Sequence, residues 1–213
     1  MKKLTLVTLL AGLMATSVAL ADPIIPTSGT IVGNSQVPGE SGGDGGLFNV
    51  TVNGSISFDT FCIELNNEFS YGVTYNYTLG QSTHGAPPAD ALLHLGTAWL
   101  YSQFEMGTFN SQLTSAGASG YMALQQAIWY YQGQVANPNN YFTTLLGSSA
   151  AEFAPSAGLY GVQVIETSPL PGDTSHGTGQ DWLYVPDGGT TIMLLGIGLT
   201  GLGLFYRRFA VAS

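Results

Sequence analysis

Residues 73–79 read Val73-Thr74-Tyr75-Asn76-Tyr77-Thr78-Leu79, with an apolar or aromatic side chain at every second position. This alternation is typical of a β-strand that buries one face. Three shorter runs upstream share the strand-like composition, and they cover 48–52, 56–58 and 60–65. We therefore predict that the region 47–79 forms strands of an antiparallel sheet.

The hydrophobic period changes after this region. Pro87-Pro88-Ala89-Asp90 is a typical helix start, and apolar residues then recur at helical spacing up to Trp99. A second helix is predicted from about Ala116 to Gln132, with Gly133 just past its end. Its buried stripe is expected to contain Tyr121, Leu124, Gln125 and Ile128.

The remaining segments complete the fold prediction. Residues 158–166 and 182–184 return to a strand pattern, whereas the Gly-, Ser- and Pro-rich residues 31–46 are predicted to be loop. The order of strands, helices and strands predicts an α+β fold, an antiparallel β-sheet or sandwich with a helical insertion.

Charge is distributed very unevenly along the 213 residues, whose formal net charge is -9. The four basic residues are Lys2, Lys3, Arg207 and Arg208, and all 13 acids lie between Asp22 and Asp187. A domain without lysine or arginine cannot neutralise phosphates by ion pairing, so a nucleic-acid partner is not expected. A catalytic lysine is excluded for the same region.

The N-terminus has the three-part layout of a secretory signal peptide. Lys2-Lys3 precedes the apolar run Leu4–Met14, and Ala19-Leu20-Ala21 offers a cleavage site. We expect residues 1–21 to be removed, although an uncleaved N-terminal anchor is an alternative. Residues 22–184 would then form the extracytoplasmic domain.

A second apolar segment, 190–206, precedes Arg207-Arg208 directly. Its length is close to the minimum for a transmembrane helix. The two arginines are expected to stay on the cytoplasmic side as a membrane stop, so the domain would face outward from the inner membrane in a single-pass, type I topology.

The motif Val185-Pro186-Asp187-Gly188-Gly189, followed by a Gly-rich apolar helix and Arg-Arg, resembles the VPDSG-CTERM sorting signal, a sister of PEP-CTERM. It departs from the name-giving motif at Gly188, where serine is usual. The resemblance implies that residues 185–213 are recognised by an exosortase-type membrane protease of a Gram-negative bacterium. The product would reach the cell surface or extracellular matrix. A plain C-terminal anchor and a GPI signal are the alternatives.

The single cysteine, Cys62, cannot form a disulfide within the chain. It is a buried hydrophobe, a partner for another chain, or a reactive group. Its segment, Thr60-Phe61-Cys62-Ile63-Glu64-Leu65, and the helical segment Leu124-Gln125-Gln126-Ala127-Ile128-Trp129 together resemble the paired signatures of bacterial Cys-Gln thioester (TQXA-type) domains. Leu124 departs from one family description, which has threonine there.

The thioester resemblance implies roles for particular residues. Cys62 and Gln125 would form an internal thioester, with Ala127, Ile128 and Trp129 as supporting motif positions. An amine or hydroxyl of a surface partner or exopolysaccharide would open the bond once, so the protein would act in adhesion without turnover and not as an enzyme. The alternative is a noncovalent structural or carbohydrate-associated domain with a buried free cysteine.

Other site predictions are weaker. Glu64 and Glu68 could form a glycosidase carboxylate pair. Scattered histidines offer little for zinc, and acidic residues of the Gly-rich loop could hold calcium weakly; these are His84, His94, His176, Glu40 and Asp44. We expect no metal and no cofactor.

Overall fold

The computed structural model describes residues 22–42, 45–83, 91–177 and 179–186. Its central element is a six-stranded sheet with the order β3-β2-β1-β4-β5-β6, in which every neighbouring pair is antiparallel. The strands are β1 (Ser28–Gly42), β2 (Gly45–Val52), β3 (Ile56–Thr60), β4 (Thr74–Gly80), β5 (Gln163–Pro169) and β6 (Trp182–Tyr184).

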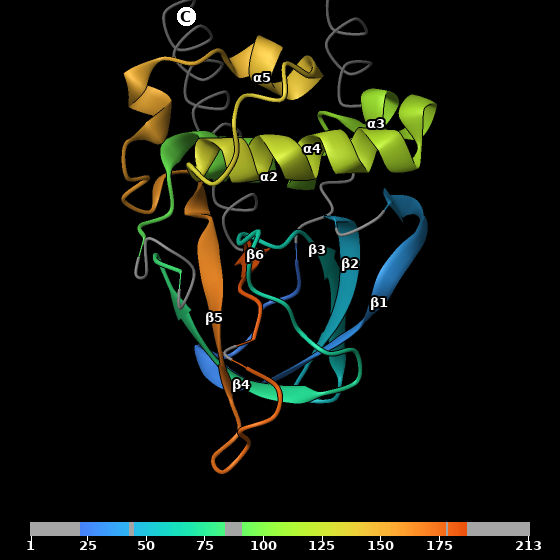
Figure 1. The fold of residues 1–213 in the computed structure, drawn as a ribbon, viewed down its shortest axis with the longest axis vertical. Helices are drawn as coiled ribbons and strands as arrows, with labels where there is room; N and C mark the ends of the chain where they lie inside the picture. Colours follow the sequence, from blue (N-terminus) through green and yellow to red (C-terminus); the bar gives the residue numbers. More distant parts are fainter. Residues whose placement is uncertain (1–21, 43–44, 84–90, 178, 187–213) are drawn as a thin grey trace, which may run out of the picture.

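The sheet curls until its two edges meet (Figure 1). After β3 the chain runs alongside β6, where Cys62 forms an antiparallel bridge with Trp182. The amide of Leu183 donates to the carbonyl of Phe61 at 3.1 Å, and the amide of Ile63 donates to the carbonyl of Asp181 at 3.0 Å. Each edge thus covers the other, which removes the exposed hydrogen-bonding groups of an open sheet.

The helices lie between β4 and β5 in the chain and cover one end of the curled sheet (Figure 1). They are α2 (Leu95–Glu105), α3 (Asn110–Ala116), α4 (Ala118–Tyr131) and α5 (Tyr141–Leu146), followed by the 3-10 turns η2 (Ala150–Phe153) and η3 (Leu159–Gly161). Helix α4 packs on β1 and β2 and is flanked by α2 and α3. The α+β class and the helical segment between strands are confirmed, and the described strands form one curled sheet.

The buried side chains form two clusters. One, the helix-facing cluster, joins the helices to the strand segments packed against them and includes Leu124, Tyr131 and Val164. The other fills the interior of the curled sheet and includes Tyr75 and Trp182. Burial of this apolar surface is the main stabilising contribution, at about 25 cal/mol per Å².

The prediction of a loop over 31–46 was wrong. Most of this segment belongs to β1, which pairs with β2 on one side and with β4 on the other. Register shifts between Gly33 and Ser35 and between Gln36 and Ser41 accommodate the Gly- and Pro-rich sequence as bulges. Gly33 is needed because the Phe69 ring would lie 2.1 Å from an added Cβ.

The first helix begins later than predicted. Ala91–His94 is extended, with bridges from Leu92 to Ser82 and from His94 to Pro155, and α2 begins at Leu95. The predicted start at Pro87–Asp90 lies outside the described residues. The second predicted helix corresponds to α4.

Two strand boundaries also differ from the prediction. β3 ends at Thr60, so Cys62 lies in a bridge beyond the strand. The expected strand at 158–166 begins only at Gln163, because Gly158 and Tyr160 have φ values of 78° and 66° that no strand allows.

The predicted signal peptide and transmembrane segment, 1–21 and 190–206, lie outside the described residues. Among the helices that are described, none is sufficiently long and apolar to span a bilayer.

Candidate functional site

Backbone pairing with β6 holds Cys62 in place. On one side of Cys62 the Phe61 carbonyl accepts from the Leu183 amide of β6, and on the other the Ile63 amide donates to the carbonyl of Asp181, just before β6. The Thr60 hydroxyl also donates to the Leu183 carbonyl at 2.6 Å. The Cys62 side chain is only 3% exposed. The thiol therefore projects from a fixed segment into the interior.

Helix α4 supplies the partner of Cys62. Gln125 occupies the buried face of α4 together with Leu124 and Ile128, and its side chain is 0% exposed. These positions share one face because residues three and four apart are neighbours on a helix. A buried amide on this face requires hydrogen-bond partners.

The structure brings Cys62 and Gln125 together through two hydrogen bonds. The thiol donates to Gln125 Oε1 with an Sγ to Oε1 distance of 3.3 Å. In return, Gln125 Nε2 donates to the backbone carbonyl of Cys62 at 2.7 Å. Because a C=O bond is about 1.2 Å long, the sulfur lies no more than about 4.5 Å from the Gln125 carbonyl carbon.

A glycine that the sequence analysis overlooked permits this approach. Gly45 lies at the start of β2, where an added Cβ would stand 2.9 Å from Gln125 Cγ and 3.0 Å from Trp129 Cη2. Gly45 stands in the Gly-rich stretch that was predicted to be loop. The only sequence signal that Gly45 packs against a helix would have been the recognition of this stretch as a strand.

The surroundings of Cys62 disfavour its ionised form. Burial raises the pKa of the Cys62 thiol well above its ordinary value, and the nearby charge of Glu64 raises it further. Trp129 opposes this rise in the pKa, although its indole N–H meets no acceptor in hydrogen-bonding geometry among the described residues. We interpret the Trp129 indole as a dipole that lies beside the Cys62 sulfur without forming a hydrogen bond to it. These surroundings thus favour the uncharged form of Cys62 over the thiolate.

A cavity of about 530 Å³ reaches Cys62 from the surface. Its lining combines aromatic, amide and acidic side chains, including Cys62, Glu64, Glu68, Phe69, Tyr71 and Gln180.

The two glutamates of the glycosidase hypothesis differ in environment. Glu64 is buried and accepts hydrogen bonds from Asn67 Nδ2 at 2.8 Å and from the Asp181 amide at 3.4 Å. Glu68 is exposed. Both line the cavity that contains Cys62.

The histidines of the zinc hypothesis are not gathered. His94 Nδ1 lies 2.7 Å from the Tyr131 carbonyl, and His176 belongs to a distant loop. His84 and the calcium candidate Asp44 lie outside the described residues, and Glu40 lines a different cavity from that of Cys62. Within the described ranges, no three His, Cys, Asp or Glu residues are placed to hold a metal ion.

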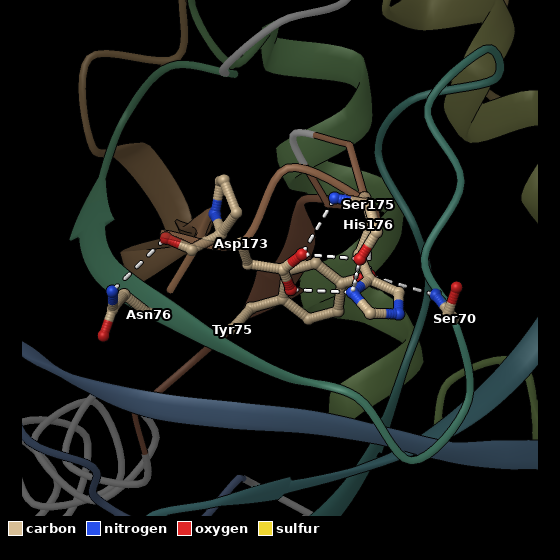
Figure 2. A network of polar contacts seen from close by, with 7 residues as sticks. Ser70, Tyr75, Asn76, Asp173, Ser175 and His176 are labelled. Carbon is tan, nitrogen blue, oxygen red and sulfur yellow. Dashed lines mark hydrogen bonds and ion pairs between the residues drawn. The ribbon is translucent and has the colours of Figure 1, made fainter. Parts of the chain in front are cut away.

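The His176 loop has the composition of a catalytic triad without its geometry (Figure 2). His176 Nδ1 contacts Asp173 Oδ2 at 2.7 Å and Ser175 Oγ at 3.1 Å, so both partners share one ring nitrogen. A serine nucleophile and its orienting carboxylate require opposite nitrogens. Tyr75 connects this loop to Ser70, whose amide donates to the Tyr75 hydroxyl at 3.1 Å. We interpret these contacts as a network that stabilises the His176 loop.

A buried acidic group was also missed by sequence reasoning. Asp22 and Glu105 are 5% and 3% exposed, and the Tyr101 hydroxyl donates to Asp22 Oδ2 at 3.0 Å. Burial raises the pKa of both carboxyls, and their mutual repulsion contributes to the rise at Glu105. No sequence pattern indicated that these two acids, which are far apart in the sequence, line the same cavity.

The proposed sorting motif begins inside the folded domain. Val185 is 3% exposed and belongs to the helix-facing cluster, and Pro186 bridges to Asp22. Asp187, Gly188, Gly189, Arg207 and Arg208 lie outside the described residues.

Comparison with known proteins identifies this motif. The family model for the VPDSG-CTERM motif matches residues 184–209. Neither the curated proteins nor the solved structures contain a match to the chain. The matched motif is that of an exported extracellular protein that is processed by exosortase, a membrane protease, and ends at the cell surface.

Proposed function

We propose that this sorted surface protein attaches covalently to a partner through an internal thioester between Cys62 and Gln125. The observation that carries the proposal is the reciprocal pairing of these side chains, with Sγ 3.3 Å from Oε1 and Nε2 2.7 Å from the Cys62 carbonyl. The pairing joins residues that are 63 positions apart.

The chemistry requires no external reagent. The Cys62 sulfur adds to the Gln125 carbonyl carbon, the C–N bond breaks, and the thiol proton leaves with the amide nitrogen as ammonia. An amide is a poor electrophile in water, so the rate must come from positioning. The two hydrogen bonds and the fixed backbone of Cys62 hold the two groups next to each other, which supports such positioning.

Burial is compatible with the product of this reaction. Desolvation raises the pKa of Cys62 because it penalises the thiolate, and the thioester, like the thiol, is uncharged. The domain also contains no lysine between residues 4 and 206, so no side-chain amine of its own can consume the bond.

The cavity beside Cys62 supports a bimolecular second step. A partner's amine or hydroxyl would attack the Gln125 acyl carbon, form an amide or ester, and return its proton to the sulfur of Cys62. A surface protein or an exopolysaccharide could supply that nucleophile. The protein reacts once and does not turn over.

A second candidate is a noncovalent structural or carbohydrate-associated surface domain. The observation in its favour is that the hydrogen bonds to Cys62 already satisfy the Gln125 amide without a covalent bond. In this case Cys62 is a buried free thiol.

Intact mass spectrometry of the purified chain separates the two candidates. With a thioester, the wild-type mass is lower than calculated by one ammonia, and methylamine adds its full mass to Gln125. Cys62→Ala should show neither effect. A wild type of full mass with a titratable thiol would contradict the covalent proposal and favour the structural one.

A further inference from the structure

The beginning of the described chain is bound along the end of β6. Asp22 Oδ2 accepts a hydrogen bond from the Val185 amide at 3.2 Å, and Asp22 forms a parallel bridge with Pro186. The Tyr184 hydroxyl donates to the Pro23 carbonyl at 3.0 Å and accepts from the Ile25 amide at 3.1 Å. The first three residues matched by the sorting motif are therefore part of the fold.

The anchoring residue is itself held from two sides. The Tyr101 hydroxyl lies 3.0 Å from Asp22 Oδ2 and 3.3 Å from Thr60 Oγ1, which links Asp22 to α2 and to β3. Asp22, Tyr184 and Val185 are each at most 5% exposed. Release of Val185 would break this buried network and expose apolar surface.

The sequence of the motif fits this arrangement. A residue before proline favours extended backbone, so Val185 is preset for pairing beside Asp22. Pro186 has no N–H to donate, so the hydrogen-bonded pairing ends with it.

We infer that Asp22 anchors the start of the sorting signal in the folded domain, so that the processing protease reaches the chain only beyond Pro186. A protease that binds its substrate as an extended strand needs the backbone groups of that segment. The Val185 amide is already bonded to Asp22, so its use would require local unfolding. Val185 and Pro186 would therefore remain with the processed domain.

Hydrogen exchange of the full-length chain in detergent micelles tests the anchor. The Val185 amide should be protected in the wild type and exchange about tenfold faster in Asp22→Ala, which removes one hydrogen-bond acceptor. Asp22→Asn retains an acceptor oxygen and should keep most of the protection. Asp173→Ala, in an exposed loop, is the control and should change nothing at Val185.

Limited proteolysis gives an independent measurement. An enzyme that cuts after tyrosine should spare the Tyr184–Val185 bond of the wild type and of Asp22→Asn, and should cut it in Asp22→Ala. Tyr101→Phe leaves position 22 intact but removes the hydroxyl that orients it, so it should also expose this bond. Rapid cutting or exchange at Val185 in the wild type would overturn the inference.

Whether Val185 and Pro186 remain with the domain is tested on the mature protein isolated from a cell that contains the sorting protease. Its C-terminal residue, determined by mass spectrometry, should be Pro186 or a later residue. A product that ends at Val185 or earlier would show that the protease reads the motif inside the anchored segment.

Discussion

Gly45 lies directly against Gln125, at a distance where a single added Cβ would come within 2.9 Å of Gln125 Cγ. The position of helix α4 on the sheet therefore depends on the absence of one side chain. Trp129 packs against the same glycine, so Gln125 and Trp129 of α4 both depend on the small size of Gly45.

Gly45→Ala should displace α4 and separate Gln125 from Cys62. Overpacking at such a contact typically destabilises a protein by about 1–3 kcal/mol. We expect a lower melting temperature and, if the thioester forms in the wild type, a smaller fraction with the ammonia-deficient mass. Unchanged stability and mass would mean that the helix shifts without cost. Ser55→Ala, at an exposed position between β2 and β3, is the control.

The adjacent residues Gln125 and Gln126 offer a matched pair. Gln125→Ala leaves the buried carbonyl of Cys62 without its donor, which should lower the free energy of unfolding by about 1–3 kcal/mol. Gln126 is exposed, and Gln126→Ala should change this free energy by less than about 0.5 kcal/mol. Urea denaturation of both variants measures the difference. Equal effects would argue against a special role for the buried amide.

Glu64→Gln should lower the pKa of the Cys62 thiol, because the charge of Glu64 contributes to its rise after burial. The pH dependence of Cys62 alkylation by a small reagent measures this pKa. The measurement is best made in a Gln125→Ala background, where no thioester can hide the thiol. Glu68→Gln provides an exposed acidic control from the same cavity. An alkylation profile that does not move would show that Glu64 is screened from the sulfur.

The full-length chain should lose stability as the pH rises. The folded state raises the pKa of Asp22 above 3.8 and that of Glu105 above 4.5, so folding favours their protonated forms. That stability is fully present below the ordinary pKa values and is lost as the pH rises through the raised ones. Tyr101 and Asp59 are the other titratable groups that affect this pair.

Glu105→Gln should reduce this pH dependence, since the amide cannot ionise. Denaturant unfolding at about pH 5 and about pH 9 would show a smaller loss of stability in the variant than in the wild type. Glu68→Gln, an exposed substitution, should follow the wild type. If stability increased toward alkaline pH, the buried pair would have a counterion that the described residues do not provide.

Sequence periodicity predicted those parts of the molecule where the local pattern and the tertiary packing agree. The stripe of α4 gave Gln125 a buried position, and alternation located β4. The length of β1 could not be predicted, because glycine and proline in this strand are tolerated only through bulges and partners on both sides. Asp22 and Glu105 line one cavity only through tertiary contacts between distant segments, for which the chain has no local signal.

The closure of the sheet has a mechanical consequence. The residues on either side of Cys62 are hydrogen-bonded to β6, and β6 leads without a loop into Val185 and Pro186. Tension on the chain beyond Pro186 would load these bonds once the Asp22 contact gave way. The ladder that positions Cys62 thus also connects it to Val185 and Pro186, and if the proposed thioester captures a partner, a pull between that partner and the chain beyond Pro186 would pass through this ladder.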